Sequence, residues 1–244
     1  MTNPTQIFGI RAIIEAINAE KSIDKVFLQK GLRGELFNEL EQLIKSKGIS
    51  CSYVPIEKLN RFDSKNHQGA VATISPVTFV SIETLVEDSL SSDTKPLFLL
   101  LDEISDVRNF GAIARTAECT GVTGIVIPKQ GAAPINGDAI KTSAGALFKI
   151  PICKVDHIKD AIYYLQASDI QVIAATEKTD NSLYDIDFDQ PCAIVMGSEG
   201  RGVNPSILKI VNQKAKLPML GTIDSLNVSV ACGAFLYEAI RQRC

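Results

Sequence analysis

From residue 96 onward, short and almost wholly apolar segments alternate with segments of helical spacing, and this alternation limits the folds open to the chain. The apolar segments include LFLLLD at residues 97–102, TGIVIP at 123–128 and PCAIVMG at 191–197. Continuous apolar runs of this length are typical of strands buried on both faces, as in parallel sheets. Helices that cross between parallel strands cover both faces of such a sheet. We therefore predict an α/β domain with a parallel sheet over residues 96–244.

The first 76 residues form a separate pattern. Apolar residues at helical spacing over 7–20 and 34–48 alternate with three short strand-like segments. Between the two patterns, residues 77–95 are acidic and contain several serines, which favours a linker. The predicted organisation is a small α/β domain at 1–76, a linker at 77–95 and the larger domain at 96–244. A chain of 244 residues is long enough for two domains.

Charge is distributed unevenly along the chain, whose net charge is −3. Residues 1–76 carry a net charge of +2, residues 77–95 of −3 and residues 96–244 of −2. Within the last of these, residues 201–244 carry +4. A surface that contacts nucleic acid must then be a local patch rather than a field over the whole protein.

Composition disfavours several classes of protein. No apolar run reaches the roughly 18 residues of a transmembrane helix, so we expect no membrane partner, and the N-terminus does not resemble a signal peptide. The six cysteines are scattered without a C-x-x-C pair. We expect reduced thiols in a cytoplasmic protein, with neither a metal site nor a disulfide framework. Of the two histidines, His67 and His157, the first is expected in a solvated loop.

A glycine-rich turn follows the apolar segment that ends at Met196, in the sequence AIVMGSEGRGVNPSIL. Its glycines, Gly197, Gly200 and Gly202, have the order G-x-x-G-x-G. The dinucleotide fingerprint requires G-x-G-x-x-G and the P-loop requires G-x-x-x-x-G-K-[ST], so neither matches. Glu199 within the turn would also repel a phosphate. A nucleotide-dependent enzyme with a phosphate site here is therefore disfavoured, although the glycines permit close approach of the backbone to another group.

Polar residues near three predicted strand ends are candidates for a site, because open α/β sheets bind ligands at the carboxyl ends of their strands. They are Asn109, Arg115, Glu199, Ser225 and Asn227. Each also has a structural alternative: Asn109 and Asn227 could cap helices, Arg115 could pair with a glutamate three residues on, Glu199 could complement a helix dipole, and Ser225 could be a turn residue.

The closing segment also has a feature of its own. A predicted strand at 214–220 leads to a final helix at 227–243. Ala231, Gly233 and Ala234 make this helix thin, so that a helix, a threaded loop or a second subunit can pack very close to it.

Three motifs in this order resemble the SpoU (TrmH-like) family of RNA ribose 2'-O-methyltransferases, within the SPOUT superfamily. The motifs are NFGAIARTAECTGVTGIVIP, AIVMGSEGRGV and LPMLGTIDSLNVSVACGAFLYEAIRQR. The N-terminal block, which ends in HQGAVA, is similar to the ribosomal-protein-like RNA-binding domain of the subgroup that methylates a guanosine in 23S ribosomal RNA. The resemblance implies a SPOUT domain with a deep trefoil knot, S-adenosylmethionine as cofactor and RNA as substrate. It also implies a homodimer in which one subunit completes the substrate site of the other.

The resemblance further assigns roles to residues. It implies a cofactor pocket lined by Gly197, Gly200, Leu217, Met219, Ser225 and Leu226. It implies a catalytic and substrate cluster of Asn109, Arg115, Glu199 and Asn227. The family proposal has the arginine activate the ribose 2'-hydroxyl. Because a guanidinium keeps its proton in proteins, we favour the hypothesis that Arg115 binds a phosphate and stabilises developing negative charge.

Two alternatives to a ribosomal RNA methyltransferase remain open at this point. The first is a transfer RNA ribose 2'-O-methyltransferase of the same family, which is less favoured because such relatives usually carry helical extensions instead of this N-terminal domain. The second is a non-catalytic RNA-binding relative. The presence of all four residues of the implied catalytic cluster speaks against it.

Overall fold

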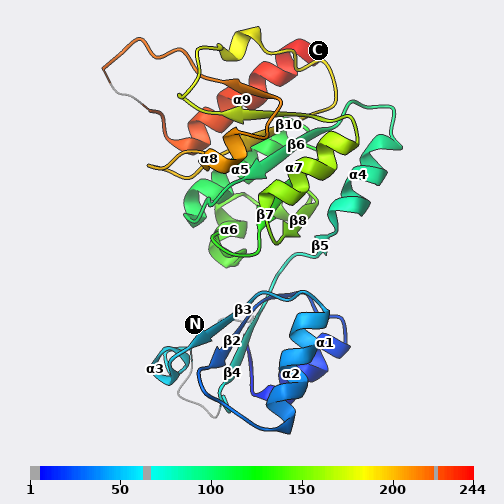
Figure 1. Ribbon diagram of the computed structural model, residues 1–244, viewed down its shortest axis with the longest axis vertical. Helices are drawn as coiled ribbons and strands as arrows, with labels where there is room; N and C mark the ends of the chain where they lie inside the picture. The colour runs from blue at the N-terminus through cyan, green and yellow to red at the C-terminus, as the bar shows by residue number, and fades with distance from the viewer. Residues whose placement is uncertain (1–5, 63–66, 223–224) are drawn as a thin grey trace. The chain divides into compact units, whose positions relative to one another are not determined.

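The computed structural model describes residues 6–62, 67–222 and 225–244 and divides into two compact units, Met1–Thr78 and Phe79–Cys244 (Figure 1). Each unit has a sheet and a hydrophobic core of its own.

The N-terminal unit contains a four-stranded mixed sheet in the order β1-β4-β2-β3. Strands β2 and β3 are parallel, and β4 runs antiparallel to both β1 and β2. The strands are β1 (Gln6–Phe8), β2 (Ile23–Gln29), β3 (Cys51–Val54) and β4 (Ala70–Ile74). The helices are α1 (Ile10–Asn18), α2 (Glu35–Ser46) and the one-turn α3 (Ile56–Leu59). The predicted helices and strands are present, and β1 is an additional strand.

One face of this sheet is covered by α1 and α2, whose apolar stripes pack on Val26 and Leu28. The opposite face carries a small cluster formed by Val54, Leu59 and Val71. The N-terminal unit is therefore an α/β domain with unequal layers.

The prediction that His67 is solvated is wrong, since its side chain is 7% exposed. Its Nδ1 accepts a hydrogen bond from the backbone N–H of Gly69 at 3.0 Å, so Nε2 carries the proton and donates to Asn60 Oδ1 at 2.9 Å. Both hydrogen bonds satisfy the buried ring. The histidine thus fixes the turn that leads into β4.

The C-terminal unit contains a seven-stranded sheet in the order β11-β9-β10-β6-β7-β8-β5. All of its neighbouring strands are parallel, which confirms the predicted sheet type. The strands are β5 (Phe79–Val80), β6 (Leu97–Leu101), β7 (Gly124–Pro128), β8 (Ile152–Val155), β9 (Gln171–Ala175), β10 (Cys192–Met196) and β11 (Gln213–Ala215). Strands β6, β7, β10 and β8 are wholly or almost wholly buried, as their apolar sequences predicted.

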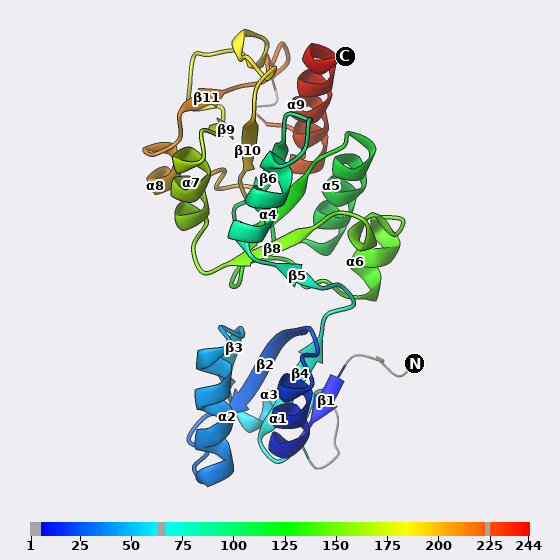
Figure 2. The ribbon, with the colours of Figure 1, turned by 90° about the vertical axis from the view of Figure 1, so that its right-hand side faces the viewer.

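Helices cover both faces of this sheet. Those on one side are α5 (Val107–Cys119), α6 (Gly137–Thr142) and α9 (Val228–Arg243), and those on the other are α4 (Ile82–Leu90), α7 (Ile158–Ala167) and α8 (Pro205–Leu208) (Figure 2). From β6 the chain proceeds through β7 and β8 in one direction and then returns to build β9 and β10 on the other side. The order of strands therefore reverses between β6 and β10, which is where open α/β sheets bind ligands. The trefoil knot implied by the resemblance stays a prediction.

The structure corrects the predicted linker at residues 77–95. Strand β5 extends the sheet beside β8, and α4 buries Leu85 and Val86 in the core of the C-terminal unit. The Ser81 Oγ caps this helix by accepting a hydrogen bond from the Thr84 N–H at 3.1 Å. Three of the four acidic residues that suggested a linker lie on the exposed side of this short helix, and the fourth, Asp93, follows it.

The predicted strand at 214–220 is also shorter than expected. Only Gln213–Ala215 forms β11, and the following residues leave the sheet at Leu217 and Pro218. Proline has no N–H to donate to a ladder, which accounts for the early end of the strand. The segment after β11 is thereby free to form a wall of the pocket described next.

Candidate active site

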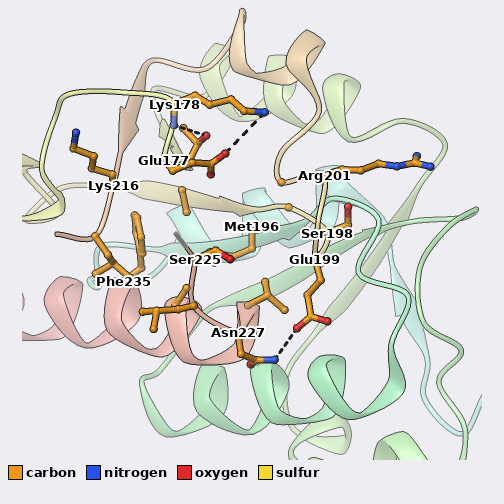
Figure 3. Close-up of a pocket in the computed structure, with 18 of the residues that line it drawn as sticks. Glu177, Lys178, Met196, Ser198, Glu199, Arg201, Lys216, Ser225, Asn227 and Phe235 are labelled. Atoms are coloured by element: carbon orange, nitrogen blue, oxygen red, sulfur yellow. Dashed lines mark hydrogen bonds and ion pairs between the residues drawn. The ribbon is translucent and has the colours of Figure 1, made fainter. Parts of the chain in front are cut away.

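A pocket of about 660 Å³ opens at the carboxyl edge of the parallel sheet, where β9, β10 and β11 end. It includes the last residue of each strand, namely Ala175, Met196 and Ala215. The loops after these strands and the first turns of α9 form its walls (Figure 3). Its volume lies within the range of small-molecule and cofactor sites.

Every residue that the resemblance assigned to the cofactor pocket lines this cavity. They are Gly197, Gly200, Leu217, Met219, Ser225 and Leu226. Glu199 and Asn227 line it as well. The structure therefore brings two separate motifs to one site, whereas the contacts of these residues with a cofactor stay a prediction.

The glycine-rich turn folds back closely on itself. A Cβ atom on Gly197 would lie 2.1 Å from the backbone carbon of Gly202 and from the nitrogen of Val203. Gly200 and Gly202 have φ angles of 86° and 69°, which favour glycine. The Gly202 N–H donates to the Ser198 carbonyl at 2.9 Å and closes the turn. Backbone packing alone is thus enough to require glycine here.

The buried Asp102, directly after β6, holds this turn to the sheet. Its N–H donates to the Met196 carbonyl, and its Oδ2 accepts from the Asn204 N–H, both at 2.8 Å. Burial raises the pKa of the Asp102 carboxyl, and the hydrogen bond from Asn204 opposes this shift. Asp102 therefore fixes both ends of the turn that forms one wall of the pocket.

Three of the four predicted catalytic residues form one hydrogen-bonded cluster beside the pocket. Asn227 Nδ2 donates to Glu199 Oε1 at 2.7 Å and to Asn109 Oδ1 at 3.0 Å. The three residues come from the start of α9, the turn after β10 and the first turn of α5. Sequence positions more than a hundred residues apart thus meet at one point.

The amide of Asn227 has its orientation fixed by four hydrogen bonds to three residues. Both Nδ2 hydrogens are used as above, and Oδ1 accepts from the backbone N–H of Ser229 at 3.0 Å and from its hydroxyl. A flipped amide would place its oxygen against the Glu199 carboxylate and the Asn109 carbonyl. Among the described residues, Glu199 Oε2 and Asn109 Nδ2 have no protein partner, so both are available to a substrate.

Arg115 does not belong to this cluster. It is exposed on α5, it does not line the pocket, and no hydrogen-bond or ion-pair partner contacts it within the described part of the chain. It follows Asn109 by six residues, which is about 9 Å along a helix axis and on a different side of it. A single chain therefore does not bring Arg115 to the other three residues.

The structural alternatives for these residues have mixed outcomes. Asp106, not Asn109, caps α5, because its Oδ1 accepts from the backbone N–H of Asn109 at 2.8 Å. Glu118 pairs with Lys149 at 2.9 Å rather than with Arg115. Asn227 does cap α9 and also joins the cluster.

Sequence reasoning missed several charged and polar residues in the pocket. Glu177 and Lys178 follow β9 and form an exposed ion pair at 3.9 Å, and Lys216 follows β11 (Figure 3). Ser198 and Phe235 line the pocket too. The rule that ligands meet the carboxyl ends of strands would have found Glu177 and Lys216, had it been applied to β9 and β11.

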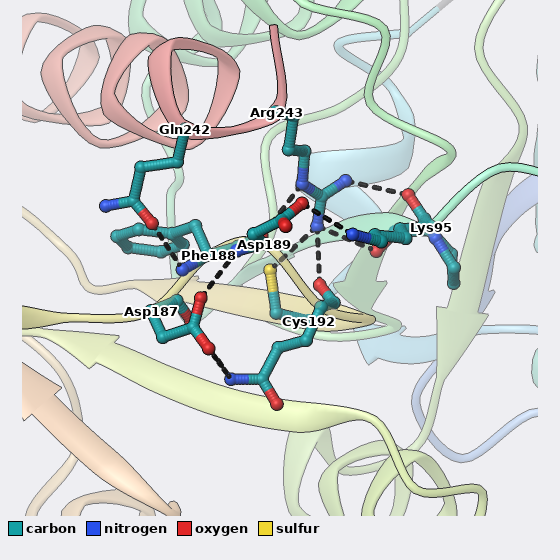
Figure 4. Close-up of polar contacts among 9 residues, drawn as sticks. Lys95, Asp187, Phe188, Asp189, Cys192, Gln242 and Arg243 are labelled. Atoms are coloured by element: carbon teal, nitrogen blue, oxygen red, sulfur yellow. Dashed lines mark hydrogen bonds and ion pairs between the residues drawn. The ribbon is translucent and has the colours of Figure 1, made fainter.

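Arg243, at the C-terminal end of α9, anchors this helix to the segments that lead into β6 and β10, at the amino ends of these strands (Figure 4). Its guanidinium donates to the carbonyls of Phe188 at 2.9 Å, and of Lys95 and Gln190 at 2.7 Å each. It also contacts Cys192 Sγ at 3.2 Å, and burial raises the pKa of that thiol to about 11. Both ends of α9 are thereby held, which positions Asn227.

The chemistry of the pocket fits S-adenosylmethionine. Leu217, Leu226 and Phe235 give it an apolar side suited to an adenine ring, while carboxylates and lysines of the rim suit a molecule that carries both signs of charge. The backbone of the glycine turn approaches the cavity without side chains. Within the described ranges, no group of three histidine, cysteine or acidic side chains could hold a metal ion, and no helix is long and apolar enough to cross a membrane.

Together the fold and the pocket define an α/β protein with a ligand site at the carboxyl edge of a parallel sheet. Comparison with known families identifies the family to which this chain belongs. The SpoU rRNA methylase family matches residues 96–237, and the domain described as RNA 2'-O ribose methyltransferase substrate binding matches residues 6–80. The chain belongs to the SpoU rRNA methylase family.

Curated relatives agree with this assignment. YacO of Bacillus subtilis (strain 168), assigned to the TrmH family of tRNA/rRNA methyltransferases, is 32% identical over 237 residues, which cover 97% of this chain and 95% of YacO. A TrmH family relative from Staphylococcus aureus is 32% identical over 240 residues and covers 98% of this chain and 96% of its own.

Solved structures share the fold. The SpoU methyltransferase AviRb from Streptomyces viridochromogenes, in complex with AdoMet, has a TM-score of 0.61 at 22% identity and covers 98% of this chain and 90% of its own. The TrmH/SpoU tRNA modifying enzyme of A. aeolicus has a TM-score of 0.57 at 32% identity and covers 66% of this chain and 82% of its own. The predicted family, α/β fold, enzyme class and cofactor are thereby confirmed: the protein is an RNA methyltransferase of a family that uses S-adenosylmethionine.

Proposed function

We propose that this protein methylates a ribose 2'-hydroxyl of a guanosine in 23S ribosomal RNA. The observation that carries the proposal is the cluster of Asn109, Glu199 and Asn227 at the mouth of a pocket suited to S-adenosylmethionine. The substrate-binding domain at 6–80 supports a structured RNA target, which implies a cytoplasmic location. Transfer RNA is the second candidate, favoured by the similarity to the tRNA modifying enzyme of A. aeolicus.

The reaction is an in-line displacement, and the bound cofactor supplies the methyl carbon to the ribose oxygen. The protein contributes orientation and electrostatics. Asn227 holds the Glu199 carboxylate in one position, so that Oε2 can accept a hydrogen bond from the substrate. Asn109 Nδ2 can donate to a neighbouring oxygen of the RNA. Dipoles that hydrogen bonds hold in a fixed orientation need little rearrangement during the reaction.

In this proposal Arg115 acts on the site of a second subunit. It is exposed and without a partner among the described residues, as expected of a group that serves a neighbouring chain. There it binds an RNA phosphate and stabilises negative charge on the attacking oxygen. Replacement by lysine tests the planar, bidentate contact: if Arg115→Lys retains most activity, that geometry is unnecessary.

Support for a homodimer comes from exposed apolar side chains on α9. Val230 and Tyr237 are 56% and 58% exposed and lie seven residues apart on one side of the helix. Gly233 and Ala234 between them keep that side thin, and α5 packs alongside α9. A surface of this kind is suited to a second copy of the chain. Light scattering at micromolar concentration tests it: a monomeric mass would contradict the proposal.

The function is tested by methyl transfer from radiolabelled S-adenosylmethionine to protein-free bacterial 23S RNA and, in parallel, to bulk transfer RNA. Ribose methylation protects the adjacent bond from alkali, which locates the modified nucleotide. One alkali-resistant guanosine in 23S RNA is the expected result. Label in transfer RNA alone would establish the second candidate. Cofactor binding without label in either RNA would point to a ribosomal precursor particle, and no cofactor binding would refute the proposal.

A further inference from the structure

The N-terminal sheet has one face that helices leave largely uncovered. Helices α1 and α2 lie on one side of β2, and only the single turn of α3 lies on the other (Figures 1 and 2). Side chains alternate along β2, so that Val26 and Leu28 are buried under the two long helices while Lys25 and Phe27 point to the α3 side. Their register neighbours on β4 and β3, Thr73 and Ser52, are half-buried as well.

Two aromatic rings and two lysines meet on this face. The rings of Phe27 and Phe62 lie 4.9 Å apart between centroids and are tilted by 38°. The ammonium groups of Lys25 and Lys58 lie 5.3 Å and 5.8 Å from the centre of the Phe27 ring. Both rings are only partly buried. We call these four residues the aromatic–lysine patch.

Neither lysine of the patch has a carboxylate partner among the residues that the structure describes. No ion pair or hydrogen bond joins Lys25 or Lys58 to an acidic side chain in the described ranges, although residues 1–76 contain eight acids. Two like charges near one ring repel each other, and an external anion would relieve that repulsion. The ring faces meanwhile offer an apolar, polarisable surface. A ligand that fits both features combines closely spaced negative charges with flat rings.

We propose that the aromatic–lysine patch binds single-stranded RNA, with a base stacked on Phe27 or Phe62 and the flanking phosphates held by Lys25 and Lys58. Sheet faces with exposed aromatics bind unpaired bases in this way, and stacking on aromatic side chains tolerates any base. The hydroxyls of Thr73 and Ser52 lie beside the patch; that of Thr73 donates to the Lys25 carbonyl at 3.2 Å and can still accept a hydrogen bond from a base edge or a ribose. The inference rests on the proposed function in that it names the part of the RNA substrate that this domain recognises, an unpaired loop or strand.

A duplex is a poorer match than a single strand. The bases of an RNA helix are stacked on one another, so their flat faces are not available to a phenylalanine ring. A duplex would therefore use only the two lysines and would gain nothing from the rings. This difference separates the proposal from general attraction between RNA and a basic domain.

The test uses the full-length protein and two probes, a fluorescein-labelled oligouridylate of about twelve nucleotides and an RNA duplex of equal length. Phe27→Leu and, separately, Phe62→Leu retain an apolar side chain but remove a ring. Lys25→Gln/Lys58→Gln removes two charges from the patch. The matched control is Lys45→Gln/Lys47→Gln, which removes two charges at the end of α2, the helix that covers the other face. Thermal melting of each variant checks its fold.

We expect either ring variant to weaken binding of oligouridylate about tenfold and duplex binding less than twofold, given the usual contribution of one stacked base. The patch lysine variant should lower the slope of log affinity against log salt by about 1.4, because each phosphate that a lysine neutralises on a single strand contributes about 0.7 to that slope. The control should leave the slope unchanged. Equal losses for single strand and duplex, or equal effects of the patch and control variants, would overturn the proposal.

The same preparations separate this inference from the proposed function. If the wild-type enzyme methylates RNA and all three patch variants have an unchanged KM for RNA, the patch proposal fails and the function stands. If oligouridylate binding depends on the patch but the wild-type protein transfers no methyl group, the function fails and the patch stands. Cofactor binding should be the same in all variants, since none of these residues lies in the C-terminal unit.

Discussion

Replacing Asn227 by aspartate would test the cluster without removing the helix cap. Aspartate retains an oxygen that can accept from the Ser229 N–H, and aspartate and asparagine are equally good caps. The change replaces the Nδ2 donor by a carboxylate oxygen that faces Glu199 Oε1 at 2.7 Å and Asn109 Oδ1 at 3.0 Å. One charge-assisted hydrogen bond and one neutral hydrogen bond are removed, and two like charges are brought together.

The magnitude follows from this geometry. A hydrogen bond to a charged group contributes about 1.5–3 kcal/mol. Two unit charges at this separation in a solvated site repel by about 1.5 kcal/mol. Glu199 is exposed and can rotate away from the new charge, which limits the repulsion. We therefore expect the two effects together to destabilise the transition state by about 3–4 kcal/mol. At 1.36 kcal/mol per factor of ten, activity should fall about 10²–10³-fold.

The assay is single-turnover methyl transfer, with thermal melting alongside. The melting temperature of Asn227→Asp should stay within about 3 °C of wild type, because the cap is retained and an anion is favourable at a helix N-terminus. Asn227→Ala, the control, should lose about 1 kcal/mol of stability as well as activity. The double variant Asn227→Asp/Glu199→Gln reverses donor and acceptor and should regain part of the activity. If Asn227→Asp keeps at least a third of the wild-type rate, the cluster has no catalytic role.

Three further outcomes are expected. Gly197→Ala should abolish S-adenosylmethionine binding by calorimetry, because its Cβ would lie 2.1 Å from backbone atoms; retained affinity would mean that the turn can open. Arg243→Met should lower the free energy of unfolding by about 2 kcal/mol in urea, since the part-buried carbonyls of Phe188 and Gln190 and the exposed carbonyl of Lys95 lose a charged donor; a change below about 0.5 kcal/mol would show that water replaces it. Burial raises the pKa values of Cys153 and Cys232 to about 12, so these thiols ionise at lower pH in the unfolded chain than in the folded one. The free energy of unfolding should therefore fall as the pH rises from about 9 towards 12. At pH 8 a thiol reagent should label the exposed Cys119, but neither buried cysteine until the protein unfolds.

Local sequence predicted those parts of the fold that depend on continuous apolar runs. The apolar segments at β6, β7 and β10 predicted buried parallel strands, because a strand that is apolar on both faces must be covered on both, and crossover helices do this in parallel sheets. The segment 77–95 was misread because its four exposed acids, three of them on α4, concealed the two residues that pack into the core. A two-turn helix offers few apolar positions, so surface composition dominates its pattern.

The site shows a similar division between local and tertiary information. The glycine turn was recognisable because its backbone requirement is local. The meeting of Asn109 with Glu199 and Asn227 depends on the packing of α5 beside α9, which no local pattern specifies. His67 was misjudged for the same reason, since the partner that allows its ring to be buried, Asn60, comes from a different turn. Only the resemblance to a family assembled these residues before the structure did.

The separation of Arg115 from the cluster leads to a decisive test of action between subunits. Mixing inactive Arg115→Ala and Asn227→Asp subunits after co-refolding or co-expression gives a statistical population in which half of the dimers contain one subunit of each kind. If Arg115 serves the partner's site, each mixed dimer has one site with an intact cluster and an intact arginine, and the mixture should recover about a quarter of the wild-type rate. If Arg115 serves its own chain, every site carries one defect and no activity returns. Arg115→Ala/Asn227→Asp subunits mixed with wild type provide the control, because the mixed dimers then lack a complete site in the first case and retain one in the second.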